Sequence, residues 1–131
     1  MFYCIIDRSS HELSFTNAGH EFPFVVGAGE HVRRLETGGL ALGMLEDFPF
    51  QEEVIQLLPD DVVVICSDGV SEAMNPSEER FGDARVEDVL KRHRHLSPND
   101  LIEKIVESVR GHAGTAPQMD DITIVIVKRT S

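Results

Sequence analysis

The stretch VVVICSDGVSEA, residues 62–73, decides the fold because it joins an apolar strand to an acidic turn. Residues 62–66 are an unbroken run of β-branched residues and one cysteine, which is typical of a buried strand. Asp68 follows almost directly, and Gly69 would let the backbone turn sharply there. We therefore expect a central strand that presents the carboxylate of Asp68 at an exposed edge of a sheet.

A second acidic stretch, Asp120-Asp121-Ile122-Thr123, comes immediately before the run IVIVK at 124–128. We expect this run to be a second buried strand. If the two strands are antiparallel neighbours, the end of the first and the start of the second lie at the same sheet edge. Asp68, Asp120 and Asp121 would then converge, and converging carboxylates need a cation or a shared proton. Carboxylate oxygens are the ligands that Mg²⁺ and Mn²⁺ prefer.

The composition is that of an ordinary globular domain. The chain has 131 residues, of which 41% are hydrophobic and 27% charged, enough for a single domain with its own core. A net charge of −11 argues against nucleic acid or an anionic membrane as a partner. No apolar run approaches the roughly 18–20 residues that cross a bilayer, and no secretion signal is recognisable. We therefore expect a cytoplasmic protein and interpret Cys4 and Cys66 as small buried residues rather than a disulfide.

The order of the expected elements predicts an α+β fold with mostly antiparallel strands. Apolar or alternating segments indicate strands at 2–7, 12–18, 22–26, 31–35 and 52–58 before the central strand. A short helix follows around 86–90. The next helix has Ser97 as its N-cap and Pro98 in its first turn, and we expect it to end at Gly111. The strand at 124–128 then returns to the sheet.

Several motifs, taken together and in order, resemble the PPM-type metal-dependent serine/threonine protein phosphatases. They are FTNAGH (15–20), the glycine-rich loop 38–43, VVICSDGVSEAMN (63–75), RFG (80–82) and PQMDDITIVIVK (117–128). The closest likeness is to the bacterial branch of that family that acts in sporulation and stress-response signalling. The resemblance covers nearly all of the chain.

This resemblance implies a fold, a site and a reaction. The fold is a sandwich of two antiparallel β-sheets flanked by helices, and the site holds two Mn²⁺ or Mg²⁺ ions. Asp68 and Asp120 correspond to metal-binding and catalytic residues, with Asp121 in a supporting position. The implied reaction is direct attack of metal-activated water on a phosphoserine or phosphothreonine. The implied substrate is a phosphorylated regulatory protein of the anti-anti-sigma type.

One departure from the family pattern has large consequences. The family also has an N-terminal motif, D-x-x-G-H-G, that supplies the acid bridging both metals, and no such motif occurs in these 131 residues. We therefore expect residues 1–131 to be the C-terminal portion of one phosphatase domain, with the N-terminal portion of the fold absent and little or no activity alone. Apolar surface left uncovered should promote a homodimer or a strand-exchanged oligomer.

Other interpretations stay open at this point. Asp68 is also a common turn residue, and Asp120 and Asp121 can simply begin a strand. Glu72 and Asn75 could touch a substrate or only cap a turn. The whole chain could be a non-catalytic interaction module, or an acidic cation-binding domain unrelated to phosphatases.

Overall fold

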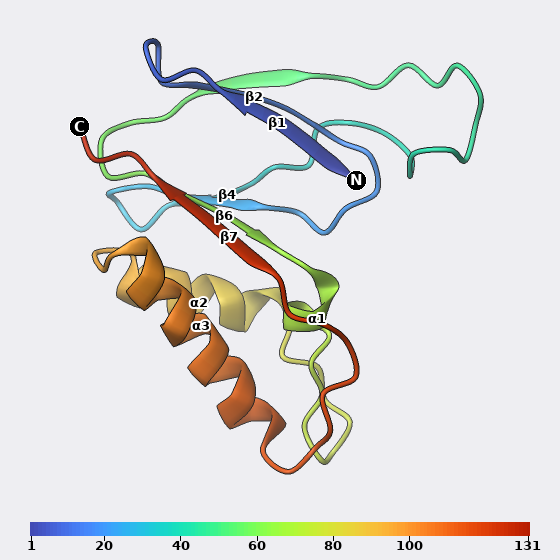
Figure 1. The fold of residues 1–131 in the computed structure, drawn as a ribbon, viewed down its shortest axis with the longest axis vertical. Coiled ribbons are helices and arrows are strands. Elements are labelled where there is room, and N and C mark those ends of the chain that lie inside the picture. Colours follow the sequence, from blue (N-terminus) through green and yellow to red (C-terminus); the bar gives the residue numbers. More distant parts are fainter.

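The computed structural model describes residues 1–131 and has three stacked layers (Figure 1). A three-stranded antiparallel sheet forms one outer layer, a four-stranded antiparallel sheet the middle, and helices the other outer layer. The first sheet has the order β1 (Phe2–Ile6), β2 (Glu12–Asn17), β5 (Glu53–Gln56), and the second has the order β4 (Val32–Arg34), β3 (Phe24–Val26), β6 (Val62–Cys66), β7 (Ile124–Lys128). The helices are α1 (Asp68–Ser71), α2 (Asp83–His93) and α3 (Pro98–Ala113). The predicted α+β sandwich of antiparallel sheets flanked by helices is confirmed.

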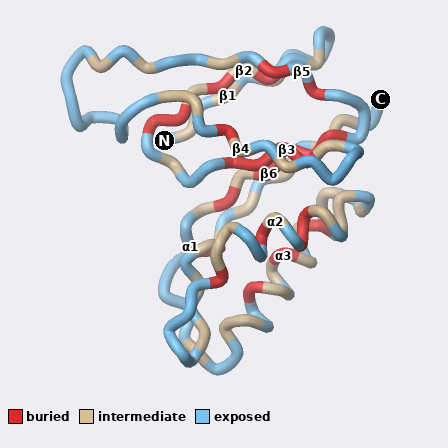
Figure 2. Tube along the Cα trace, turned by 180° about the vertical axis from the view of Figure 1, so that it is seen from behind, coloured by how far each residue is buried: buried red, intermediate tan, exposed pale blue.

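Strand β6 is apolar throughout because it is covered on both faces. Val62 and Val64 belong to the core that the four-stranded sheet shares with the helices. Val63 belongs to a second core, between the two sheets, together with Leu13 and Phe15 of β2. Figure 2 shows buried segments along the strands and on parts of the helices. The alternation of a pleated strand thus sends successive valines into different cores.

Helix α3 begins where the sequence predicts but ends later. The Ser97 side chain accepts a hydrogen bond from the backbone N–H of Asp100, as expected of an N-cap. The prediction that Gly111 ends the helix is wrong. The helix continues to Ala113, and Gly114, with φ of 56°, stands at its C-terminus, where a positive φ suits glycine.

The strand β7 is not buried, contrary to the prediction. It forms one edge of the four-stranded sheet next to β6, and its residues alternate between half-buried and exposed. Ile124 and Ile126 pack toward the helical core, whereas Val125 and Val127 are 49% and 38% exposed. An apolar run at a sheet edge therefore leaves a row of valines uncovered.

Arg34 connects the edge strand β4 to the helical layer. Its guanidinium donates hydrogen bonds to Glu87 Oε1 at 2.7 and 3.0 Å and to Asp83 Oδ2 at 3.1 Å. The hydrogen bond to Glu87, more than the charge of Asp83, raises the pKa of this guanidinium.

No helix of the structure is both long and apolar enough to span a bilayer.

Candidate functional site

The pairing of β6 with β7 places the two acidic stretches at one sheet edge. The strands are antiparallel, and Cys66 at the end of β6 pairs with Ile124 at the start of β7. Asp68 therefore follows one strand at the place where Asp120 and Asp121 precede the other. Figure 1 shows α1 beside the chain that enters β7. The predicted neighbouring of these strands is confirmed.

Ser67 joins the two acidic stretches by three hydrogen bonds. Its hydroxyl donates to the carbonyl oxygen of Asp121 at 3.0 Å and accepts from the N–H of Thr123 at 3.0 Å. Its own N–H donates to the carbonyl oxygen of Thr123 at 2.9 Å. Because the side chain uses both its donor and its acceptor on the same segment, the ends of β6 and β7 are held in a fixed relation. Sequence reasoning missed this residue, whose one signal was its place directly before Asp68.

Gly69 has a second role besides the turn that the sequence suggested. The chain does turn there, with the N–H of Val70 donating to the carbonyl oxygen of Ser67 at 3.1 Å, and the turn is part of the one-turn helix α1. Gly69 is also pressed against the opposite segment: a Cβ at this position would lie 2.2 Å from the carbonyl oxygen of Asp121. Any larger residue would push the two acidic stretches apart. The glycine is thus required by close backbone approach.

The three predicted aspartates are all exposed at this edge. A side-chain oxygen of Asp120, Oδ1, accepts a hydrogen bond of 2.7 Å from the N–H of Asp121. The carbonyl oxygen of Asp120 accepts another, of 2.9 Å, from Gln118 Nε2. Local contacts therefore orient Asp120, while the roles of Asp68, Asp120 and Asp121 as metal ligands stay predictions.

The donor set fits part of a metal site but does not complete one. Carboxylate oxygens on two adjacent segments suit a hard divalent cation such as Mg²⁺ or Mn²⁺. Nowhere in the chain, however, do three or more His, Cys, Asp or Glu side chains gather where they could hold a metal ion. The 131 residues thus offer oxygen ligands to a metal without enclosing it.

Cys66, two residues before Asp68, is not a nucleophile. Its thiol is free and buried, and burial, with a smaller contribution from the charge of Asp83, raises its pKa to about 12. A thiol with this pKa is protonated at neutral pH, whereas the thiolate is the reactive form. The interpretation of Cys66 as a small buried residue is confirmed, whereas Cys4 is only half-buried.

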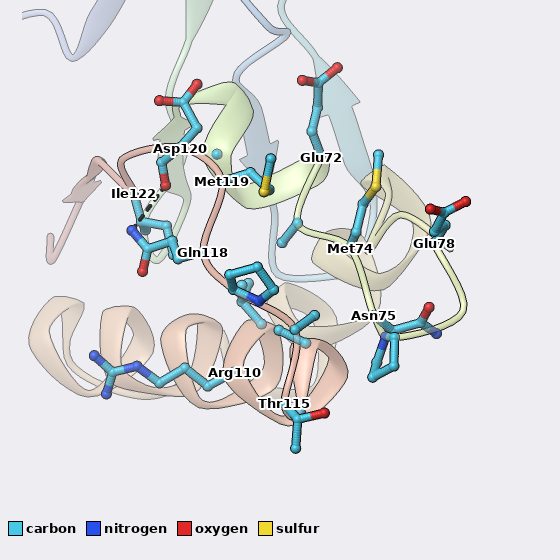
Figure 3. Close-up of a pocket in the computed structure, with 18 residues that line it drawn as sticks. Glu72, Met74, Asn75, Glu78, Arg110, Thr115, Gln118, Met119, Asp120 and Ile122 are labelled. Carbon is cyan, nitrogen blue, oxygen red and sulfur yellow. Dashed lines mark hydrogen bonds between the residues drawn. The ribbon is translucent and has the colours of Figure 1, made fainter.

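A groove of about 780 Å³ opens beside Asp120. Glu72, Met74 and Glu78 line one side, and the end of α3 with the following loop lines the other (Figure 3). The carboxylates of Asp120 and Glu72 both point away from α3 in this view. The sequence did not predict this groove, although the methionines at 74 and 119, each in a polar loop beside acids, were a possible signal.

Two polar residues near the groove have structural partners. Glu72 forms an exposed ion pair of 3.1 Å with Arg80. Asn75 Oδ1 accepts hydrogen bonds from the N–H groups of Ser77 and Glu79 at 3.0 and 2.9 Å. These contacts favour the interpretation of Asn75 as a turn cap.

Comparison with known proteins identifies similar chains over nearly the whole length. The family model described as stage II sporulation protein E (SpoIIE) matches residues 1–130. Protein IcfG of Synechocystis is 31% identical over 129 residues, which are 98% of this chain and 20% of that protein. The phosphoserine phosphatase RsbU of Bacillus subtilis is 26% identical over 131 residues, which are 98% of this chain and 38% of that protein.

A solved structure has the same fold. The phosphatase domain of SpoIIE from Bacillus subtilis, in a form presoaked with Mn, superposes with a TM-score of 0.75 at 21% identity. The match covers 99% of this chain and 56% of that one. The chain therefore spans about half of the solved phosphatase domain, and less than half of each curated relative.

Proposed function

The chain belongs to the SpoIIE family, and from this premise we propose that it is the C-terminal portion of a PPM-type phosphatase domain that hydrolyses phosphoserine or phosphothreonine in a regulatory protein. The match of the family model to residues 1–130 carries the proposal. The relative RsbU, itself named a phosphoserine phosphatase, supports the reaction class. The share of 56% in the solved domain supports the assignment of residues 1–131 to one portion of such a domain.

The acids at the edge formed by β6 and β7 are the proposed metal ligands. Asp68 and Asp120 would each give carboxylate oxygens to Mn²⁺ or Mg²⁺, and Asp121 would support them. A bound ion of this kind supplies an activated water molecule for attack on phosphorus. The chain's own contribution is placement, because Ser67 and the close approach of Gly69 keep the two acidic segments together. The Mn presoak of the SpoIIE phosphatase domain is in keeping with this choice of ion.

The proposed substrate is a phosphorylated protein of the anti-anti-sigma type. A second candidate function is a non-catalytic interaction module with a phosphatase fold. One observation favours the second: no three potential ligands gather around a metal position in the chain. Since a two-metal centre needs more than two carboxylates, these residues would bind the ions weakly by themselves.

Manganese-dependent hydrolysis of p-nitrophenyl phosphate separates the two candidates. We expect little activity from residues 1–131 and clear activity from a longer protein that also carries a D-x-x-G-H-G motif. In that protein, Asp68→Asn and Asp120→Asn should each lower Mn²⁺ affinity at least tenfold by titration calorimetry. Asp60→Asn is the matched control, because Asp60 is an exposed turn residue with φ of 68°, which asparagine tolerates. Silence of the longer protein would favour the module, and unchanged Mn²⁺ affinity would remove the aspartates from the proposal.

We also propose that the chain forms a homodimer or a strand-exchanged oligomer. Apolar side chains on edge strands support this: Tyr3 and Ile5 of β1, Val54 of β5, and Val125 and Val127 of β7 are between 38% and 57% exposed. Uncovered apolar edges favour pairing with another chain. Size-exclusion chromatography with light scattering should give at least twice the monomer mass. A stable monomer at micromolar concentration would refute this association.

A further inference from the structure

The groove beside Asp120 is built from two segments that are far apart in the sequence. One side is the segment from Glu72 to Glu78, and the other is the last turn of α3 with the loop that ends at Met119 (Figure 3). Its volume of about 780 Å³ lies within the range of about 300–1,000 Å³ that is usual for ligand pockets. Such a groove can take several side chains of a peptide.

The walls of the groove are held in place before any ligand arrives. Phe81, which follows the first wall, is 3% exposed and belongs to the helical core. Its ring packs edge-on against His112 of α3 with centroids 5.5 Å apart. His112 Nε2 also lies 2.8 Å from the carbonyl oxygen of Glu79. Because these contacts join the two walls, binding would require little reorganisation.

The lining of the groove favours an apolar ligand. Met74 and Met119 lie on opposite walls and are 37% and 80% exposed. Methionine is flexible and polarisable, and exposed methionines are common on surfaces that bind varied apolar side chains. Because Met119 is 80% exposed, a ligand that covers it would gain the free energy of burying its apolar surface.

The charge of the groove favours a cationic ligand. Glu72, Glu78 and Asp120 line it against a single basic residue, Arg110. Glu72 already pairs with Arg80 at 3.1 Å, so the carboxylates left to act on a ligand are those of Glu78 and Asp120. These two would repel a phosphate group and attract lysine or arginine. The groove nevertheless reaches Asp120, a proposed metal ligand, so a peptide bound in it would lie next to the site of phosphate chemistry.

We propose that this groove binds the stretch of the phosphoprotein substrate that flanks its phosphoserine, and that it selects apolar and basic residues there. The inference rests on the proposed function for its substrate class. The phosphate would lie at the aspartates and the flanking residues in the groove. The acidic lining would therefore also determine the orientation in which the substrate binds. Substrate preference would therefore depend on Met74, Met119 and Glu78 as well as on the metal site.

The test measures peptide affinity by fluorescence polarisation, with the longer protein that is assayed for phosphatase activity. The probe is a fluorescein-labelled peptide with serine flanked on both sides by leucine and lysine, in phosphorylated and unphosphorylated forms. A second probe has glutamate in place of every leucine and lysine. We expect the unphosphorylated leucine–lysine peptide to bind at least tenfold more tightly than the glutamate peptide, without any metal.

Two variants and a control assign the effect to the groove. Met119→Glu should weaken binding of the leucine–lysine peptide about tenfold, which corresponds to the loss of one buried apolar side chain. Glu78→Lys should reduce the preference for the leucine–lysine peptide over the glutamate peptide at least fivefold, an effect that a merely structural role would not produce. Met44→Glu is the matched control, because Met44 is 66% exposed and lies outside the groove. Circular dichroism verifies the fold of each variant.

The outcomes separate this inference from the proposed function. Equal affinity for the two probes, or equal effects of Met119→Glu and Met44→Glu, would overturn the inference even if phosphopeptide is hydrolysed. Selective binding without Mn²⁺-dependent hydrolysis by the longer protein would support the groove and contradict the enzyme. A Met119→Glu protein that loses self-association but keeps peptide affinity would show that a second copy is the occupant, which also overturns the inference.

Discussion

Replacing Gly69 by alanine should force apart the two segments that carry the acids. The added Cβ would lie 2.2 Å from the carbonyl oxygen of Asp121, 2.9 Å from its carbonyl carbon and 3.4 Å from the carbonyl carbon of Asp120. Comfortable separations between nonbonded heavy atoms are about 3.5 Å, so the segment at 120–121 must move by roughly 1 Å. The obstacle is backbone held by Ser67, not the free end of a side chain.

The expected size of the effect follows from two opposing contributions. Alanine in place of glycine within a helix ordinarily stabilises by about 0.5–1 kcal/mol. Overpacking against a fixed neighbour costs about 1–3 kcal/mol, and this contribution should prevail. We expect the free energy of unfolding of Gly69→Ala to fall by about 1–2 kcal/mol, and Mn²⁺ affinity to fall with it, because Asp120 would move relative to Asp68.

Urea denaturation followed by circular dichroism measures the change, with Gly111→Ala as the matched control. Gly111 lies inside α3, and a Cβ there would meet nothing within 4 Å. That variant should therefore be stabilised by about 0.5–1 kcal/mol. The two glycine-to-alanine changes should shift the urea midpoint in opposite directions at an unchanged slope. A Gly69→Ala protein as stable as the control, with unaltered Mn²⁺ affinity, would refute the role of close backbone approach.

Three further perturbations test the surrounding contacts by the same unfolding measurement. Ser67→Ala removes two side-chain hydrogen bonds between the acidic segments and should cost about 1–2 kcal/mol; no loss would mean that strand pairing alone holds the edge. Arg34→Ala breaks the contacts to Asp83 and Glu87 and should cost about 1 kcal/mol, less at high salt; a salt-independent loss would contradict an ionic origin. Because burial raises the pKa of Cys66 from 9.0 to about 12, the folded state holds this proton more tightly than the unfolded state. The protonated Cys66 thiol therefore contributes fully to the free energy of unfolding below pH 9. This contribution should decline between pH 9 and 12, by on the order of 4 kcal/mol. Cys66→Ala should show a flatter decline than the parent, and an identical slope would contradict this assignment.

The strands were predictable because their patterns reflect which layer covers them. The run at 62–66 predicts a buried strand, and β6 contacts both cores. The run at 124–128 reads the same way, yet Val125 and Val127 are exposed. A sequence pattern records that a face is apolar without recording what covers it. The same pattern therefore fits a central strand and an edge strand.

Local signals at glycines were less informative. Gly69 indicated the turn after Asp68 but not the helix α1, because four residues are too few to show a helical period. The need for glycine itself is explained by the segment that it touches. Gly111 and Gly114 are three residues apart, and only the φ of 56° at Gly114 identifies the helix end. Glycine indicates that a side chain is excluded, and the reason becomes visible only in three dimensions.

The candidate site was predictable where it depended on strand ends and unpredictable where it depended on distant loops. The placement of Asp68 and Asp120 at one sheet edge was predicted from the ends of two antiparallel neighbouring strands, and β6 does pair with β7 in this way. The groove was not predictable, because it needs Met74 and Met119 to face each other across segments joined through His112. Residues 74–83 had only the polar composition of an exposed loop.

The charge of this sheet edge explains why the proposed phosphatase site would depend on a cation. The chain carries a net charge of −11, and Asp68, Asp120 and Asp121 are exposed where β6 ends and β7 begins. The nearby Arg80 is already paired with Glu72 at 3.1 Å, so it does not offset these acids. A phosphoserine dianion bound at this edge would be repelled by these acids, and salt screens such repulsion little at separations below the Debye length of about 8–10 Å.

The same acids that repel phosphate would hold the ion that attracts it. Without a divalent cation, phosphorylation should therefore weaken the binding of a peptide to this face, and with Mn²⁺ it should strengthen it. A basic flank in the groove beside Glu78 and Asp120 needs no such ion, since those carboxylates attract it directly. Recognition of the flank and recognition of the phosphate can thus be measured separately. The flank should bind with or without the metal, whereas the metal should change the effect of phosphorylation on affinity from unfavourable to favourable.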